Sequence, residues 1–198
     1  GGMGAYSPVP FVNDELDIII NKEVIEPTIR GLSDDGISFR GFLYAGLMID
    51  SNRKPKVLEY NCRFGDPETQ PIMLRLKSDL IDMIQACFSG CISDYDIQWD
   101  QKSAMGVVMS SIGYPESYET GKEIVGLNEF SDRKDIKVFH SGTCSKDNNI
   151  LTDGGRVLCV TALGDNINQS KENTYAAVDK IDWDGKYYRR DIGFRVMK

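Results

Sequence analysis

Apolar side chains recur at helical spacing near the start of the chain. Asn13 or Asp14 can cap this segment, and the spacing predicts one helix of about five turns that ends between Gly31 and Gly36. Pro27 lies inside it and predicts a kink or an early break, because proline lacks the N–H that the helix ladder needs. Residues 1–12, rich in Gly and Pro, are predicted to form a loop. The apolar positions of the helix are Leu16, Ile19, Ile20, Val24, Ile25, Ile29 and Leu32.

The pattern then changes to that of a hairpin. Two apolar runs, Phe39–Ile49 and Lys56–Asn61, flank the polar stretch 50–55 and predict two antiparallel strands. A loop is predicted over Phe64–Pro71. Two short helices follow, over Ile72–Leu76 and Ser78–Ser89, with Gly90 as the C-terminal cap.

After Gly90, short apolar runs alternate with glycine turns, which is typical of an antiparallel β unit. One amphipathic helix interrupts them, and we place a domain boundary near Asp100. The predicted fold class is therefore α+β, with one domain over 1–100 and a β-rich domain over 101–198. The predicted elements are strands Ala104–Ile112, Glu123–Leu127, Lys137–Ser141 and Arg156–Leu163, helix Asn168–Lys180 and a closing strand Tyr187–Phe194.

Composition narrows the classes of function. Lys and Arg number 23 and Asp and Glu 30, so the net charge of −7 argues against binding to a nucleic-acid backbone. No run approaches the roughly 20 apolar residues that a membrane span needs, so no membrane partner is expected. The five cysteines are an odd number without a secretory segment, which favours a reduced, cytoplasmic protein.

The most informative stretch is residues 56–70. Side chains alternate on a strand, so Glu59, Asn61 and Arg63 are expected on one face, and Leu58, Tyr60 and Cys62 in the packing on the other. A carboxylate and an amide oxygen are hard ligands that Mg²⁺ accepts, with phosphates and waters in its other positions. An arginine beside them suits a phosphate or a developing anion. The triplet thus points to a nucleotide–metal site for phosphoryl transfer.

An alternative stays open, in which Glu59 and Arg63 form an ordinary surface ion pair. The polar loop Phe64–Gln70 favours a binding role, because binding residues commonly lie on loops held by a rigid element. His140, the only histidine, fits an acid–base role or a structural one. Arg156, after Gly154 and Gly155, fits a phosphate contact or a tight hairpin turn.

Asn61–Pro71 and Gly41–Met48 together resemble the phosphoribosylamine–glycine ligase family, ATP-grasp enzymes of purine synthesis. Further stretches carry the resemblance along the whole chain in the family's order. They are Gly1–Pro8, Gly106–Met109, Gly113–Pro115, Val138–Thr143, Gly154–Gly164 and Asp191–Arg195.

The resemblance implies a fold and a chemistry. It implies the second half of an ATP-grasp domain followed by a small domain similar to a barrel-sandwich hybrid. It implies that Glu59 and Asn61 bind Mg²⁺ (or Mn²⁺) and that Arg63 contacts the transferred phosphoryl group. The implied reaction joins glycine to 5-phosphoribosylamine with ATP as co-substrate, through a glycyl phosphate. Asp66 and Glu68 are then expected to bind the ammonium of glycine or the ribosyl hydroxyls.

Two departures qualify the resemblance. Many ATP-grasp enzymes place a second acidic metal ligand on the preceding strand, but that position falls near Gly46, so a second metal ion is in doubt. The N-terminal domain and the lysine-bearing lid that precede this region in the family are not in the sequence. This leads to the expectation that the N-terminal half of the same enzyme is a partner. Two rivals remain: an inactive folded fragment or interaction module, and an ATP-grasp ligase with another acceptor.

Overall fold

The computed structural model describes residues 2–196 and divides them into two compact units. Among these residues, unit 1 comprises 2–8, 66–76 and 99–196, and unit 2 comprises 9–65 and 77–98. Each unit is therefore assembled from segments that are separate in the sequence. The predicted domains, 1–100 and 101–198, are consecutive stretches of sequence, whereas the two units are groups of residues in contact. The domain division stays a prediction.

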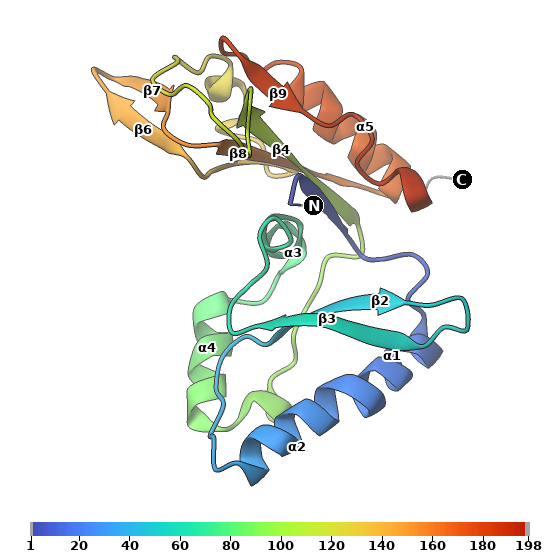
Figure 1. Ribbon diagram of the computed structural model, residues 1–198. Coiled ribbons are helices and arrows are strands. Elements are labelled where there is room, and N and C mark those ends of the chain that lie inside the picture. Colours follow the sequence, from blue (N-terminus) through green and yellow to red (C-terminus); the bar gives the residue numbers. More distant parts are fainter. Residues whose placement is uncertain (1, 197–198) are drawn as a thin grey trace. The chain divides into compact units, whose positions relative to one another are not determined.

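Unit 1 is built on an open antiparallel sheet of five strands (Figure 1). The order is β1-β4-β8-β5, and β9 pairs with the same strand β4 as β1 does, further along its length. Among residues 2–196 the strands close no barrel. The strands are β1 (Gly4–Ser7), β4 (Ser103–Ser111), β5 (Ile136–His140), β8 (Arg156–Gly164) and β9 (Lys186–Tyr188).

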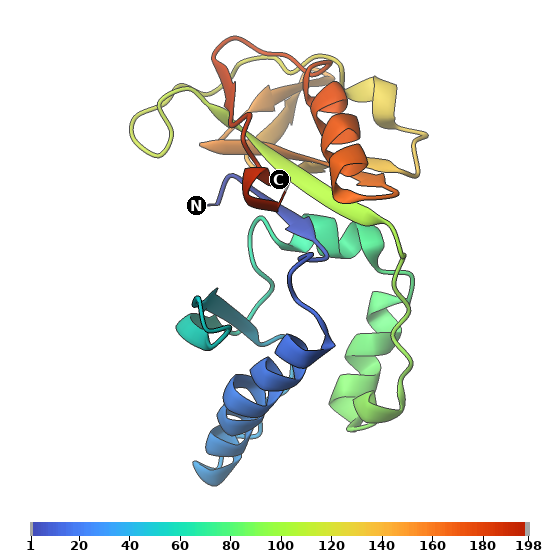
Figure 2. The same cartoon turned by 90° about the vertical axis from the view of Figure 1, so that its right-hand side faces the viewer.

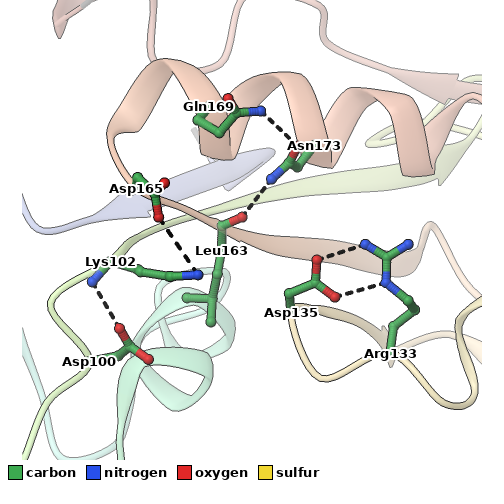
Figure 3. A network of polar contacts seen from close by, with 8 residues as sticks. All are labelled: Asp100, Lys102, Arg133, Asp135, Leu163, Asp165, Gln169 and Asn173. Atoms are coloured by element: carbon green, nitrogen blue, oxygen red, sulfur yellow. Dashed lines mark hydrogen bonds and ion pairs between the residues drawn. The ribbon is translucent and has the colours of Figure 1, made fainter.

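The core of unit 1 lies where β4 and β8 pair. Both strands are buried almost along their whole length, as in a sheet covered on both faces. The helix α5 (Ile167–Val178) lies along this sheet (Figure 1). Thr174 Oγ1, fully buried in α5, lies 2.6 Å from the Ser170 carbonyl of its own helix and 3.0 Å from the Met105 carbonyl of β4, and its single O–H is shared between them. The Asn173 amide donates to the Leu163 carbonyl over 2.8 Å (Figure 3), so polar contacts fix α5 on the sheet.

The predictions for the centre of unit 1 are confirmed, and those for its periphery are wrong in part. Within residues 123–127, only Glu123 and Val125 form isolated bridges and Leu127 begins a 3₁₀ turn, because the chain turns at Gly126 with φ 87°. The closing strand ends at Tyr188, and the predicted N-terminal loop contains β1. The remaining elements are α3 (Thr69–Arg75), β6 (Thr143–Lys146), β7 (Asn149–Thr152) and two 3₁₀ turns, Leu127–Phe130 and Phe194–Val196.

Unit 2 begins with the predicted helix, which continues through Pro27 (Figure 2). It consists of α1 (Asp14–Ile20), a π-helical segment (Asn21–Ile25) and α2 (Glu26–Asp34). Asn13 caps it by accepting a hydrogen bond from the Leu16 N–H over 3.1 Å. Pro27 falls in the first turn of α2, where its missing N–H is tolerated because the hydrogen-bond pattern changes from π to α just before it.

The rest of unit 2 is a two-stranded ribbon and one further helix. The ribbon joins β2 (Tyr44–Ile49) to β3 (Pro55–Asn61), so the hairpin is confirmed although its first strand starts later than predicted. The helix α4 (Leu80–Ser89) starts at Asp79, whose carboxylate accepts two backbone N–H groups. It ends at Gly90 with φ 76°, as predicted. A 3₁₀ turn spans Ile92–Asp94.

One face of the ribbon differs from the prediction. Leu58 is 65% exposed, Tyr60 is 43% exposed and Cys62 is exposed, so they do not lie in packing. The Tyr60 hydroxyl lies 2.7 Å from Thr28 Oγ1 of α2. A third strand or a further layer would be needed to bury this face. In the part of the chain that the structure describes, no helix has the length and apolar character required to cross a membrane.

Candidate functional site

The candidate metal ligands lie side by side at the end of β3. The amide Nδ2 of Asn61 is 3.2 Å from Glu59 Oε1, so the two side chains share a face as the strand alternation predicts. Glu59 is exposed and Asn61 is half-buried. Two adjacent oxygen-bearing groups with access to water suit a cation that keeps several waters or phosphate oxygens around it.

The opposite strand makes room for Glu59. Gly46 pairs with Glu59 in the register of the ribbon, and Leu47 pairs with Val57, so a β-bulge leaves Leu58 without a partner. A Cβ at Gly46 would lie 3.1 Å from Glu59 Cγ. The register thus places Gly46, which has no side chain, opposite Glu59. Among residues 2–196, no group of three or more His, Cys, Asp and Glu is arranged to hold a metal ion.

Arg63 follows on the irregular chain after β3. Its guanidinium donates to the Phe64 carbonyl over 2.9 Å and is exposed. It forms no ion pair with Glu59 or with another described carboxylate, so the alternative of a surface pair is not supported. The rings of Phe42 and Phe64 stack with centroids 3.8 Å apart, which anchors the start of the loop. Arg63 therefore presents a positive charge that no described carboxylate neutralises.

The two carboxylates of the loop have different surroundings within unit 1. Asp66 Oδ2 lies 2.6 Å from Arg156 Nη2, and Gln70 Nε2 is 3.4 Å from the other oxygen of Asp66. Glu68 is the residue just before α3, and its carboxylate has no ion-pair partner among the described residues. Asp66 is thus already compensated by a cation, whereas Glu68 is not.

His140 contacts a neighbouring hydroxyl group, and the glycines before Arg156 lie against neighbouring segments of the chain. His140 Nδ1, at the end of β5, is 3.0 Å from the hydroxyl of Thr143, the first residue of β6. Gly154 and Gly155 do not form a hairpin turn, because β8 pairs with β4 and β5 and not with β7. Instead they allow close approach of neighbouring chains: a Cβ at Gly155 would lie 2.2 Å from the Tyr114 ring. The expectation of a tight hairpin at this point is wrong.

Cys159 lies on β8, close to the Asp66–Arg156 pair. Burial raises the pKa of its thiol to about 12, against a smaller lowering from the hydrogen bond with Thr161. The charge of Asp66 also raises this pKa slightly, and that of Arg156 lowers it. Cys159 is therefore a packed thiol and not a nucleophile at neutral pH.

Two family models match the chain. Residues 1–69 match the phosphoribosylglycinamide synthetase ATP-grasp (A) domain, and residues 104–195 match the C domain of the same synthetase. The chain belongs to the phosphoribosylglycinamide synthetase family. Its relatives include phosphoribosylamine–glycine ligases from Vibrio cholerae, 49% identical over 197 residues, and Allochromatium vinosum, 51% identical over 197 residues. Both matches cover 100% of this chain and 46% of the relative, so the chain spans about half the length of these proteins.

Solved structures agree on the fold of this family member. The phosphoribosylamine–glycine ligase of Thermotoga maritima is 32% identical and superposes with a TM-score of 0.82, over 96% of this chain and 46% of that one. A biotin carboxylase from Campylobacter jejuni is 13% identical with a TM-score of 0.63, over 98% of this chain and 42% of that one, which reflects the fold alone. The mixed helix-and-sheet architecture is thus shared with ATP-grasp-like proteins.

The sequence predicted that Glu59 and Asn61 share a face of the strand, which the structure confirms, but it did not predict the contact between Asp66 and Arg156. These two residues are 90 positions apart, and no local pattern links them. The only sequence signal was the Gly154-Gly155-Arg156 stretch, which marked Arg156 as a candidate without indicating its partner.

Proposed function

We propose that this chain is the C-terminal part of an ATP- and Mg²⁺-dependent ligase that joins glycine to 5-phosphoribosylamine in purine biosynthesis. The observation that carries the proposal is the match to both domain models of one synthetase, in order, over 1–69 and 104–195. The relatives are named phosphoribosylamine–glycine ligases, which supplies the substrates. The matching fold at a TM-score of 0.82 supports the same conclusion.

The proposed reaction has two steps. An oxygen of the glycine carboxylate attacks the γ-phosphorus of ATP, giving glycyl phosphate and releasing ADP. The amine of 5-phosphoribosylamine then attacks the carbonyl carbon, loses a proton and expels inorganic phosphate as the amide bond forms. No protein nucleophile takes part. The role of the protein is therefore to position the substrates and to stabilise the charge of the phosphoryl group.

Glu59 and Asn61 are proposed as the protein ligands of Mg²⁺ (or Mn²⁺). The 3.2 Å contact between their side chains supports this, because two adjacent oxygen-bearing groups leave the other octahedral positions to phosphates and water. When bound, the metal would offset the charge of the nucleotide phosphates. The glycine at position 46, opposite Glu59, leaves a single protein carboxylate, which favours one protein-held ion.

Arg63 is proposed as the catalytic residue that stabilises the transferred phosphoryl group. Its exposed guanidinium has no carboxylate partner among the described residues, so its charge is available to an anion. Asp66 and Glu68 are proposed to bind substrate, through the ammonium of glycine or the ribosyl hydroxyls. Both belong to the loop that follows the metal strand.

The N-terminal half of the same enzyme is the proposed partner. The chain spans 46% of its relatives, and unit 2 exposes several large apolar side chains that a further layer would cover. In this proposal residues 1–100 are the second half of the ATP-grasp domain, and residues 101–198 are a β-rich domain similar to a barrel-sandwich hybrid. A cytoplasmic location, without a nucleic-acid or membrane partner, fits the substrates. The exposed apolar residues include Ile18, Ile37, Met48, Leu58, Ile81 and Phe88.

A hybrid enzyme tests the proposed function. In it, the segment of the Vibrio cholerae ligase that aligns with this chain is replaced by residues 1–198. We expect ADP release that requires both glycine and 5-phosphoribosylamine, the latter formed in situ from ribose 5-phosphate and ammonia. A folded hybrid that releases no ADP, or that prefers another acceptor amine, would contradict the proposal.

A second candidate is an inactive fragment or interaction module, which the half-length coverage of the relatives favours. It predicts that the isolated chain binds ATP with Mg²⁺ weakly or not at all. Isothermal titration of the isolated chain separates the two views, because micromolar affinity would exclude the module.

A further inference from the structure

Arg156 stands at the start of β8, a central and almost fully buried strand of unit 1. It is the first residue of β8, the strand that pairs with both β4 and β5. The next two residues, Val157 and Leu158, are fully buried. The Arg156 carbonyl accepts the Gly142 N–H over 3.0 Å, so the backbone of Arg156 is fixed on that side too. Its guanidinium therefore extends from a firmly held base.

The guanidinium of Arg156 links this strand to two loops. Nη2 lies 2.6 Å from the Asp66 carboxylate, and Nη1 donates to the carbonyls of Asp66 and Gly2, each over 3.2 Å. Gly2 has φ 74°, and a Cβ there would come within 3.2 Å of Arg156 Nη1. The side chain of Arg156 is 28% exposed. Its hydrogen bonds therefore contribute more to stability than those of fully exposed pairs usually do.

The number and direction of these contacts suit arginine and not lysine. A planar guanidinium presents its N–H groups in a fixed fork, so one side chain can satisfy a carboxylate and two carbonyls at once. An ammonium group on a flexible stem cannot hold the same three acceptors in this geometry. Arg156 thus fixes both the position of Asp66 and the path of the chain around it.

We propose that Arg156 is a positioning residue that acts through Asp66 to hold the loop after the metal strand. On this view Asp66 is the anchor of the loop, and Glu68 is the carboxylate that receives the cationic ammonium of the substrate. The proposal rests on the function proposed above, and it replaces the substrate-binding role given there to Asp66 with a positioning role while keeping that of Glu68. The division follows from charge: Asp66 is neutralised by Arg156, whereas Glu68 has no ion-pair partner among the described residues.

Amide hydrogen exchange on the chain alone tests the anchor without any assumption about catalysis. The variants are Arg156→Met, Asp66→Asn and the double variant. We expect both single variants to speed exchange in residues 66–70 by about tenfold, and Arg156→Met alone to speed it also in residues 2–4, with amides 158–162 of β8 unchanged. The double variant should exchange no faster than Arg156→Met, because that variant already removes the contact with the Asp66 carboxylate. Additive effects, or no effect, would overturn the proposal.

The pair Arg133–Asp135 is the matched control. It is also an ion pair between arginine and aspartate, with two hydrogen bonds of 2.8 and 2.7 Å (Figure 3). Its partners are only two residues apart in the sequence, so the pair does not connect distant segments. Arg133→Met and Asp135→Asn should leave exchange in residues 66–70 at the wild-type rate. A change there with the control variants would show that any lost ion pair loosens the loop, and would overturn the specific role of Arg156.

Kinetic measurements on the hybrid enzyme then distinguish a positioning role of Asp66 from direct contact between Asp66 and the substrate. Arg156→Met and Asp66→Asn should each lower kcat by about 100-fold without additivity, as expected when a reacting group is displaced by about 1 Å. Glu68→Gln should raise the KM for glycine and change kcat little. If Asp66→Asn raises that KM while loop exchange stays at the wild-type rate, Asp66 binds the substrate directly and the proposal is wrong. If the unmodified hybrid is inactive, the proposed function fails, and the exchange result still decides the role of Arg156.

Discussion

The two units of this chain differ in how completely they bury their apolar residues. Unit 1 has a continuous core between β4, β8 and α5, whereas in unit 2 only Leu16 and Val24 are buried among the apolar side chains. A two-stranded ribbon with helices on one side is marginal by itself. The residues proposed to hold the metal and the phosphoryl group lie on that ribbon and just beyond it. In this proposal the chemistry is therefore carried by the less completely packed unit.

The difference in burial indicates which unit is stable by itself and which needs a further layer. Unit 1 can hold its shape by burial of its own side chains, and it anchors the loop of Asp66 and Glu68 through Arg156. Unit 2 leaves apolar surface on the face of β3 opposite to Glu59 and Asn61. We expect the N-terminal half of the enzyme to cover such surface and to stabilise the ribbon that carries the metal ligands.

The largest contrast is expected in thiol labelling. Cys62 and Cys91 of unit 2 are exposed, whereas Cys159 of unit 1 is buried with a pKa raised to about 12. Cys159 should react with iodoacetamide at pH 8 about a thousandfold or more slowly than Cys62, because reaction requires opening of the core. Mass spectrometry of timed samples measures this. Equal rates for Cys159 and Cys62 would show that unit 1 lacks the core described above.

A matched pair of leucines tests the same contrast in stability. Leu158 is fully buried in β8, and Leu58 is 65% exposed on β3. Leu158→Ala should lower the free energy of unfolding by about 2–5 kcal/mol, through lost burial and a new cavity. Leu58→Ala should change it by less than about 0.5 kcal/mol. Urea unfolding followed by circular dichroism measures both, and a costly Leu58→Ala would place that side chain in a core.

Two glycines sharpen the comparison at the level of the backbone. A Cβ at Gly164 would lie 2.2 Å from the Ser170 backbone nitrogen, whereas a Cβ at Gly31 in α2 would meet nothing within 4 Å. Gly164→Ala should destabilise unit 1 by about 1–3 kcal/mol. Gly31→Ala should stabilise α2 by about 0.4–1 kcal/mol, because alanine loses less entropy in a helix. Thermal melts of the two variants measure both changes, which should have opposite signs.

The smallest effect concerns pH. The hydrogen bonds from Arg133 hold the pKa of Asp135 below its ordinary value of 3.8. A lowered pKa in the folded state stabilises the fold above pH 3.8, and the contribution is lost as the pH falls through the folded value. Asp135→Asn should therefore lower stability slightly at pH 7 and have no effect well below pH 3. Unfolding curves at both pH values check this, and an equal loss at both would contradict it.

Much of unit 1 was predictable from the sequence, because its central strands and α5 are long and strongly patterned. The predicted strand at 123–127 was wrong because Gly126 turns the chain there, and β1 was missed because it lies within residues 1–12, which are rich in Gly and Pro. The exposure of Leu58 and Tyr60 was not predictable, since an apolar strand residue signals a covering layer without saying which segment provides it. The Asp66–Arg156 pair depends on tertiary contact over 90 positions, and local patterns cannot encode it.

The central claim is that Glu59 on β3 supports phosphoryl transfer, and glycine-dependent ADP release by the hybrid enzyme tests it most directly. The variant is Glu59→Gln, and the control is Glu23→Gln, an exposed residue of the π-helical segment outside the proposed site. At saturating Mg²⁺ we predict a loss of about 100-fold or more for Glu59→Gln, equal to about 2.7 kcal/mol in the barrier, and near-wild-type release for the control. Near-normal turnover of Glu59→Gln under these conditions would contradict the claim.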